Sequence, residues 1–163
     1  MTLRFRPSKN QFVLMASTQT FVELRERLRD VGTLETLAAA EPITLLTVTN
    51  SPGEPRSRWA SLVEQFDDIA FLPILIDRQD QPHYPTGHIT VRFAKAPSDE
   101  ELQTLAVKYR LQLRERNKYD PLQASFTPKD LRSVYLPEII SEVSRSDNVS
   151  SAWANVRSRH RLV

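Results

Sequence analysis

The chain has 163 residues, of which 40% are hydrophobic and 26% charged, and its 22 lysines and arginines nearly balance 20 aspartates and glutamates. This composition predicts a folded globular protein, because disordered chains have fewer apolar residues and a larger net charge. The absence of cysteine excludes disulfide bonds, thiolate metal ligands and a thiol nucleophile. No apolar run approaches the roughly 18 residues of a membrane span, and nothing near Met1 resembles a signal peptide, so we expect no membrane segment and, by default, a cytoplasmic protein.

The first 76 residues predict a small α/β lobe. Two short apolar runs around Pro7–Asn10 predict a hairpin within 3–16. Thr20 and Glu23 form a capping box, which begins a helix that ends at Gly32. The remaining expected elements are a short Ala/Leu-rich helix at 33–41, a strand at 43–49, a helix with Trp59 and Phe66 on its apolar face, and a strand at 69–76 in which Pro73 favours an edge or a bulge.

A polar segment at 77–87, with two prolines and a glycine, predicts a connector between domains. Residues 88–163 then predict strands at 88–94, 111–116, 122–127 and 149–156, with helices after Ser98 and at Pro137. The order β-α-β-β-α-β is typical of a ferredoxin-like lobe. The predicted fold class is therefore α+β, with this lobe preceded by the smaller α/β lobe. The order expected for the first lobe, β-β-α-α-β-α-β, is different, so no internal repeat is predicted.

The sequence offers little catalytic chemistry. His83, His88 and His160 have no partners at metal-ligand spacing, and no nucleophile motif or Gly-rich phosphate loop is present. The acidic pair Asp67–Asp68 is typical of a turn, and the acids at 99–101 suit the first turn of a helix. We therefore expect no enzymatic activity, no metal and no cofactor.

The charge distribution argues against nucleic-acid binding. The formal net charge is +2, and the last residues contain Arg157, Arg159 and Arg161 without any acid, so the body of the chain is close to neutral. An RNA-binding ferredoxin-like domain would carry glycine and stacking aromatics on a central strand, where this sequence supplies only Phe93. The arginine tail is the main support for that alternative.

Three segments of the second half resemble the N-terminal prodomains of bacterial subtilisin-like serine proteases, above all the fervidolysin-like propeptide inhibitors. Segment 72–93 contains Tyr84-Pro85-Thr86-Gly87 leading into a strand, 98–111 is a capped helix, and 136–163 is a late helix followed by Asn148–Trp153. The similarity is good over 70–163 and fainter over 1–69. The resemblance rests on the order and spacing of these segments together, and not on a single diagnostic motif.

The resemblance implies a non-catalytic module that binds a subtilisin-like serine protease in cis or in trans, as inhibitor, folding chaperone or both. In such prodomains the open sheet packs on the protease, and the chain that follows enters the active-site cleft like a cleaved substrate. Extended backbone in the cleft would supply main-chain hydrogen bonds. The family's catalytic domain is absent here, so we expect a stand-alone relative or a prodomain cut from a longer precursor. The matching cleft tail is Arg157, Arg159, His160, Arg161, Leu162 and Val163, and the expected sheet contacts are Ile89, Val91, Leu111, Leu113, Phe126 and Trp153.

Two other functions remain open. The first is a regulatory protein that keeps the prodomain fold but binds another protein through its sheet face. An exposed sheet face would also favour homo-oligomers when no partner is present. The second is a nucleic-acid-binding module that uses the arginine tail, whose binding would weaken steeply with salt.

Overall fold

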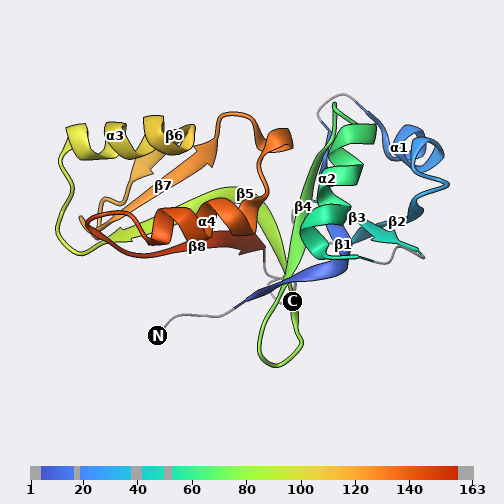
Figure 1. Ribbon diagram of the computed structural model, residues 1–163, viewed down its shortest axis with the longest axis horizontal. Helices are drawn as coiled ribbons and strands as arrows, with labels where there is room; N and C mark the ends of the chain where they lie inside the picture. The colour runs from blue at the N-terminus through green and yellow to red at the C-terminus, as the bar shows by residue number, and fades with distance from the viewer. Residues whose placement is uncertain (1–4, 17–18, 38–41, 50–52, 158–163) are drawn as a thin grey trace. The chain divides into compact units, whose positions relative to one another are not determined.

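The computed structural model of the chain describes residues 5–16, 19–37, 42–49 and 53–157 (Figure 1). These residues form antiparallel strand pairs and four α-helices, which confirms the α+β class. They divide into two compact units, one of residues 5–85 with 156–157 and one of residues 86–155, which are described separately below. In the described ranges, no helix has the length and apolarity needed to cross a membrane.

The N-terminal unit is a sheet with the strand order β2-β3-β1-β4. Its strands pair antiparallel, and β5 begins in this unit, where His83 pairs with Leu75 of β4. The core includes the fully buried rings of Phe12 and Phe71, which meet edge to face. The elements are β1 (Arg6–Met15), α1 (Phe21–Arg27), β2 (Gly32–Leu37), β3 (Ile43–Val48), α2 (Pro55–Gln65) and β4 (Ala70–Ile76).

The helix expected at 33–41 is wrong over its described part, because Gly32–Leu37 form strand β2. β2 pairs along its whole length with β3, from Gly32 opposite Val48 to Leu37 opposite Ile43. The backbones approach so closely that a Cβ on Gly32 would lie 2.0 Å from the carbonyl oxygen of Thr47. Pairing with a buried neighbour therefore outweighs the local helix propensity of this stretch.

The expected hairpin within 3–16 is also wrong for the described residues, since 6–15 form the single strand β1. What looked like a turn is an irregularity in the ladder with β4, where Pro7 pairs with Leu75 but Phe12 pairs with Pro73. The Ser8 hydroxyl accepts hydrogen bonds from the backbone N–H groups of Asn10 and Gln11 within it. Pro73 thus sits beside a bulge, one of the two positions expected for it.

The C-terminal unit has the strand order β8-β5-β7-β6. Residues 77–81 of the expected connector make a turn, whereas 82–87 are the first half of β5. The other expected strands and helices of this half are present, with ends that differ by a few residues. The elements are β5 (Pro82–Phe93), α3 (Asp99–Tyr109), β6 (Leu111–Arg116), β7 (Gln123–Pro128), a short 3-10 turn (Leu131–Ser133), α4 (Leu136–Ser144) and β8 (Val149–Arg157).

Both units therefore have the element order β-α-β-β-α-β. Numbered within each unit, the strand order is 4-1-3-2 in both. The expectation of no internal repeat is wrong at the level of connectivity. The expectation was wrong because the first unit was assigned one strand too many at its start and a helix in place of β2, so its element order differed from that of the second unit.

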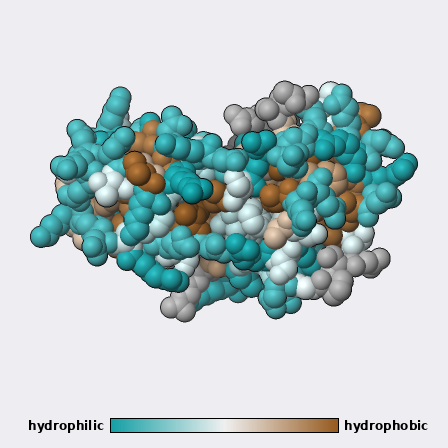
Figure 2. Space-filling model, turned by 45° about the horizontal axis from the view of Figure 1, so that its top comes forward, coloured by the Kyte–Doolittle hydropathy of each residue, from teal (hydrophilic) through white to brown (hydrophobic). Residues whose placement is uncertain are grey.

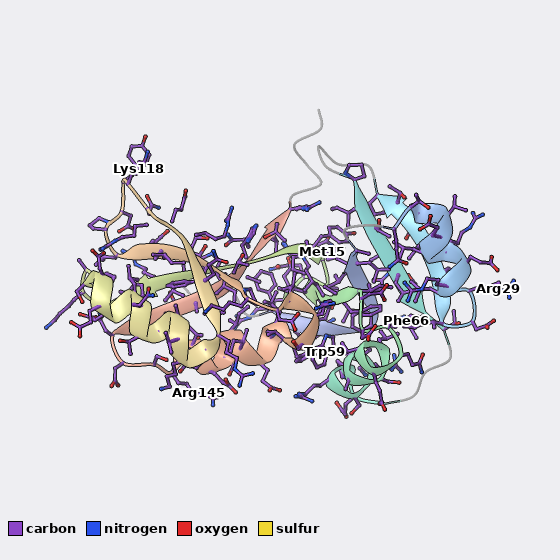
Figure 3. The ribbon with its side chains drawn as sticks, turned by 90° about the horizontal axis from the view of Figure 1, so that it is seen from above. Met15, Arg29, Trp59, Phe66, Lys118 and Arg145 are labelled. Atoms are coloured by element: carbon purple, nitrogen blue, oxygen red, sulfur yellow. The ribbon has the colours of Figure 1, made fainter. Side chains whose placement is uncertain are left out.

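Helices α3 and α4 lie on the same side of the C-terminal sheet (Figure 3). The Ser98 hydroxyl caps α3 by accepting from the Glu101 N–H at 3.1 Å, and Arg110 ends the helix with a left-handed φ of 54°. The Tyr109 hydroxyl reaches α4, donating to the Glu142 carbonyl oxygen at 3.3 Å. Figure 2 shows a mostly hydrophilic surface with small hydrophobic patches enclosed by polar side chains.

Candidate protein-interaction site

The side of the C-terminal sheet away from α3 and α4 is the candidate site, and we call it the open face. From residue 85 to the end of β5 burial alternates, with Ile89 and Val91 buried and His88, Thr90 and Arg92 half-buried. This is the period of two expected for a strand covered on one side. The open face consists of His88, Thr90 and Arg92 of β5, Gln123, Ser125 and Thr127 of β7, Arg114 of β6, and Trp153 and Asn155 of β8.

Hydrogen bonds between side chains join the strands across this face. The Thr90 hydroxyl donates to Asn155 Oδ1 at 2.6 Å, and the Thr86 hydroxyl donates to the Asn155 carbonyl oxygen at 3.3 Å. Thr90 pairs in the ladder with Ser125, whose hydroxyl accepts from Arg114 Nη1 at 3.4 Å. At the open face, Asn155 thus links the edge strand β8 to β5 in addition to the pairing of the two strands.

A cavity of about 160 Å³ opens at the centre of the network. Its lining is almost entirely polar, from Thr90, Arg114, Glu115, Asn117, Gln123, Ser125 and Asn155, with the small side chain of Ala124. Pockets for small molecules are usually larger, roughly 300–1,000 Å³, and mostly apolar. This hollow instead suits one polar side chain of a protein partner.

An ion pair and a histidine border the face. Arg92 Nη1 donates to Asp120 Oδ2 at 2.6 Å, and Asp120 Oδ1 accepts from the Leu122 N–H at 3.0 Å. The Leu122 N–H first, and Arg92 second, lower the pKa of Asp120 below its usual value. On the other side, His88 Nδ1 contacts the Thr127 hydroxyl. Polar groups near this face are thus largely engaged with one another, which suits a preorganised binding surface.

The structure places the expected sheet contacts on two different sides. Ile89, Val91, Leu111 and Phe126 are almost completely inaccessible within the core, so they offer no surface to a partner, and the expectation for them is corrected. Leu113 and Trp153 are half-buried. The four buried residues are the apolar positions of their strands, and those positions face the unit's own helices.

The residues that do form the open face could have been found from the same pattern. In the segment 88–93 every second residue is polar or charged, and those residues must point away from the core. Of the expected cleft tail, Arg157 is half-buried at the end of β8. Arg159, His160, Arg161, Leu162 and Val163 lie outside the described residues.

The other candidate residues have structural partners. Asp77 Oδ2 contacts His83 Nε2 at 2.8 Å beside the turn before β5, and this contact is the main cause of the lowered pKa of Asp77. Asp68 accepts two hydrogen bonds from Arg27, at 2.8 and 2.9 Å. Across the described part of the chain, no three histidines or carboxylates gather closely enough to hold a metal ion.

No known protein family matches this chain, and a search of curated proteins finds no match.

Proposed function

We propose that the chain is a non-catalytic, prodomain-like module that binds a subtilisin-like serine protease as an inhibitor, a folding chaperone or both. The proposal rests on the segment-by-segment resemblance of residues 70–163 to subtilisin-like prodomains. The strand order β8-β5-β7-β6 with two helices supports a ferredoxin-like lobe, because the split β-α-β pattern gives that order.

The single observation that carries the proposal is the open face. It is a polar, half-exposed sheet surface, backed by a complete apolar core on the other side. A rigid surface of this kind binds at low entropic cost, because its side chains are already held by hydrogen bonds. In the proposed complex Trp153 provides the large apolar contact, and the cavity around Asn155 receives a polar side chain of the protease.

Strand β8 connects this face with the cleft tail. Asn155 contributes to the open face, and two residues later Arg157 ends the strand. Docking of the open face would therefore deliver the following residues close to the active-site cleft at a high effective concentration. In that cleft the tail acts as a bound product does, by main-chain pairing and without chemistry of its own.

The open face also supports a protein partner over RNA. RNA-binding sheets of this connectivity stack bases on aromatic side chains of the central strands. Here the central strands β5 and β7 present no phenylalanine, tyrosine or tryptophan on that face, His88 is their one ring, and Trp153 belongs to β8. This composition favours hydrogen bonding to another protein surface.

The test is an inhibition assay with the full chain. Purified chain is mixed in increasing molar excess with subtilisin, and release of p-nitroaniline from a chromogenic peptide is followed. We expect slowed hydrolysis by subtilisin and no effect on chymotrypsin, a serine protease of unrelated fold. Equal slowing of both enzymes would show that the chain merely competes as a substrate. Unchanged hydrolysis by a panel of subtilisin-like proteases, together with no binding to their active-site-blocked forms, would overturn the proposal.

A further inference from the structure

The tip of the β6–β7 hairpin carries the most exposed large hydrophobic side chain among the described residues. Tyr119 is 96% exposed, compared with 66% for Val22 and 67% for Val107. Its side chain makes no hydrogen bond, ion pair or ring contact with any residue in the described ranges. Aromatic rings stabilise a fold through the area that they bury, so this ring contributes little to the fold that carries it.

The backbone around Tyr119 is held by a hydrogen-bonded turn. Asn117 Oδ1 accepts from the N–H groups of Tyr119, at 2.8 Å, and of Asp120, at 3.1 Å. The Asn117 N–H donates to the Gln123 carbonyl oxygen at 3.0 Å, and the Gln123 N–H donates to the Asp120 carbonyl oxygen at 3.1 Å. Asparagine side chains commonly close turns in this way. The turn therefore presents the tyrosine ring from a fixed backbone.

Two contacts join the tip to the open face. Asn117 also lines the central cavity of that face, and Arg92 of the open face donates to Asp120 Oδ2 at 2.6 Å. In Figure 3 the tip, marked by Lys118, extends on the side of the sheet away from α3 and α4. A partner seated on the open face would therefore meet Tyr119 at the border of the contact.

Next to the ring, the tip carries a cation without an acidic partner in the described part of the chain. Lys118 is exposed and forms no ion pair there. The neighbouring acid, Asp120, is engaged by Arg92 and by the Leu122 N–H. The tip thus presents an aromatic ring beside an unpaired ammonium group. The matching surface on a partner is an apolar recess bordered by a carboxylate.

The surroundings of the tip favour a protein over a nucleic acid as this partner. Proteins that bind single strands stack several bases on aromatic side chains along a positively charged groove. The strands next to the tip, β6 and β7, contain one aromatic residue, Phe126, which is completely buried. The cavity beside the tip is lined by Glu115 as well as by Arg114. A single exposed ring without a basic groove suits a recess in a protein surface.

We propose that Tyr119 is an anchor residue of the complex with the subtilisin-like protease, and that its ring enters an apolar recess of that protein beside the contact with the open face. This inference rests on the proposed function and deepens it. Binding energy at protein interfaces is concentrated in a few residues, and tyrosine is enriched among them. Because the turn already holds the backbone, little conformational freedom is lost when the ring docks. Lys118 then lies at the rim of the recess, near an acidic group of the protease.

The test measures, by calorimetry, how full-length variants bind subtilisin whose active-site serine is blocked. Tyr119→Ala should weaken binding by about thirtyfold or more, the usual effect of truncating an anchor residue, while the urea unfolding midpoint stays that of the parent chain. Val107→Ala is the matched control, because Val107 is similarly exposed on α3 of the same unit, away from the open face. It should leave binding unchanged.

The outcomes separate this inference from the proposed function. If the parent chain and Tyr119→Ala bind equally well, or if Val107→Ala weakens binding as much, the anchor role is wrong although the proposed function stands. If Tyr119→Ala lowers the unfolding midpoint strongly, the residue is structural and the anchor role is also wrong. If the parent chain binds no subtilisin-like protease, the proposed function fails, and this inference fails with it.

Two further variants test the chemistry of the recess. Tyr119→Phe removes only the hydroxyl and should bind within about threefold of the parent chain, whereas a loss as large as that of Tyr119→Ala would contradict an apolar recess. Lys118→Glu should weaken binding by about tenfold, and unchanged or tighter binding would contradict an acidic border. A single-stranded oligonucleotide that binds the parent chain but not Tyr119→Ala would overturn the proposal in favour of a nucleic-acid partner.

Discussion

Thr90 and Asn155 lie 65 residues apart in the chain, and the hydroxyl of the first donates to the amide oxygen of the second at 2.6 Å. The bond spans β5 and the edge strand β8 on the open face. β8 is an edge strand in the order β8-β5-β7-β6, so it has a paired neighbour on one side only. Asn155 therefore contributes both to the attachment of this strand and to the surface proposed for binding.

Thr90→Val should loosen this attachment. The substitution keeps the size and the β-branching but leaves Asn155 Oδ1 without its donor, at an expected cost of about 1 kcal/mol in the free energy of unfolding. Urea unfolding measures the loss, and faster hydrogen exchange in β8 locates it. Ser150→Ala, at an exposed position of the same strand, is the control and should change stability little. Equal effects of the two variants would contradict the role given to the Thr90–Asn155 bond.

Ser125→Arg should separate binding from folding. Ser125 is a half-buried open-face residue at the edge of the central cavity, so a long charged side chain there fills the hollow and obstructs a docked surface. We expect subtilisin inhibition to be lost while the unfolding midpoint stays close to that of the parent chain. Thr104→Arg, on the exposed surface of α3, introduces the same side chain and should leave inhibition intact. Retained inhibition in Ser125→Arg would place the protease contact elsewhere.

Phe126→Ala tests the opposite side of the same strand. Phe126 is completely buried and neighbours Ser125 in sequence, so truncation leaves a cavity and should cost about 3–5 kcal/mol of stability. Thermal unfolding should show a large decrease in midpoint. Thr127→Ala, at the next, half-buried position, should cost much less, although it removes the contact with His88. A mild effect at Phe126 would mean that this residue is more accessible than the structure shows.

The tip of the β6–β7 hairpin should depend on pH through Asp120. Its pKa is lowered from the usual 3.8 by the Leu122 N–H and by Arg92, so the carboxylate form is favoured in the folded chain. The stabilising contribution is therefore present above the ordinary carboxyl pKa and is lost as the pH falls through the lowered value. NMR signals from residues 117–122, where Lys118 marks the tip in Figure 3, should move over that range.

Asp120→Asn is the control for this titration. It cannot ionise, so the signals of the tip should no longer follow the acidic titration, while the remaining carboxylates still titrate. Persistence of the same transition in Asp120→Asn would assign it to another acid.

Gly32→Ala should destabilise the N-terminal unit. The added Cβ would meet the Thr47 carbonyl oxygen at 2.0 Å, and because that atom is backbone, the β2–β3 pair must move apart. We expect a loss of about 1–3 kcal/mol, the usual cost of overpacking. Glu35→Ala, at an exposed position of β2, should have little effect. If residues 33–37 were helical, as their composition indicated, Gly32→Ala would change urea unfolding little.

The second half of the chain could be predicted because its local signals agree with its tertiary environment. The strand 111–116 alternates, the helix after Ser98 begins with a capping hydroxyl, and both are present at the expected places. The stretch 32–37 does not meet this condition. It is a strand because it pairs with β3, and no local pattern within 32–37 predicts that pairing. A strand that forms because of its pairing partner cannot be predicted from the propensity of its own residues.

The contact residues expected from the sequence lie on strands that also carry the open face, but most of them are on the covered side of those strands. Ile89 and Val91 were predicted as contacts because they are apolar. In a sheet covered by helices on one side, however, the apolar positions are the covered ones. The polar residues that alternate with them in 88–93 mark the outward-facing set, so this part of the face was readable from the sequence. Thr90, Ser125 and Asn155 also meet across three strands, a proximity that depends on the strand order.

The alternation along 88–93 of β5 places core residues and surface residues at adjacent codons. Exchanges at Ile89 or Val91 change the core, whereas exchanges at Thr90 or Arg92 change the surface that we propose for binding. Drift in one set can proceed while the other stays constant. Descendants of a single ancestral gene can in this way acquire new binding preferences and still inherit the same architecture.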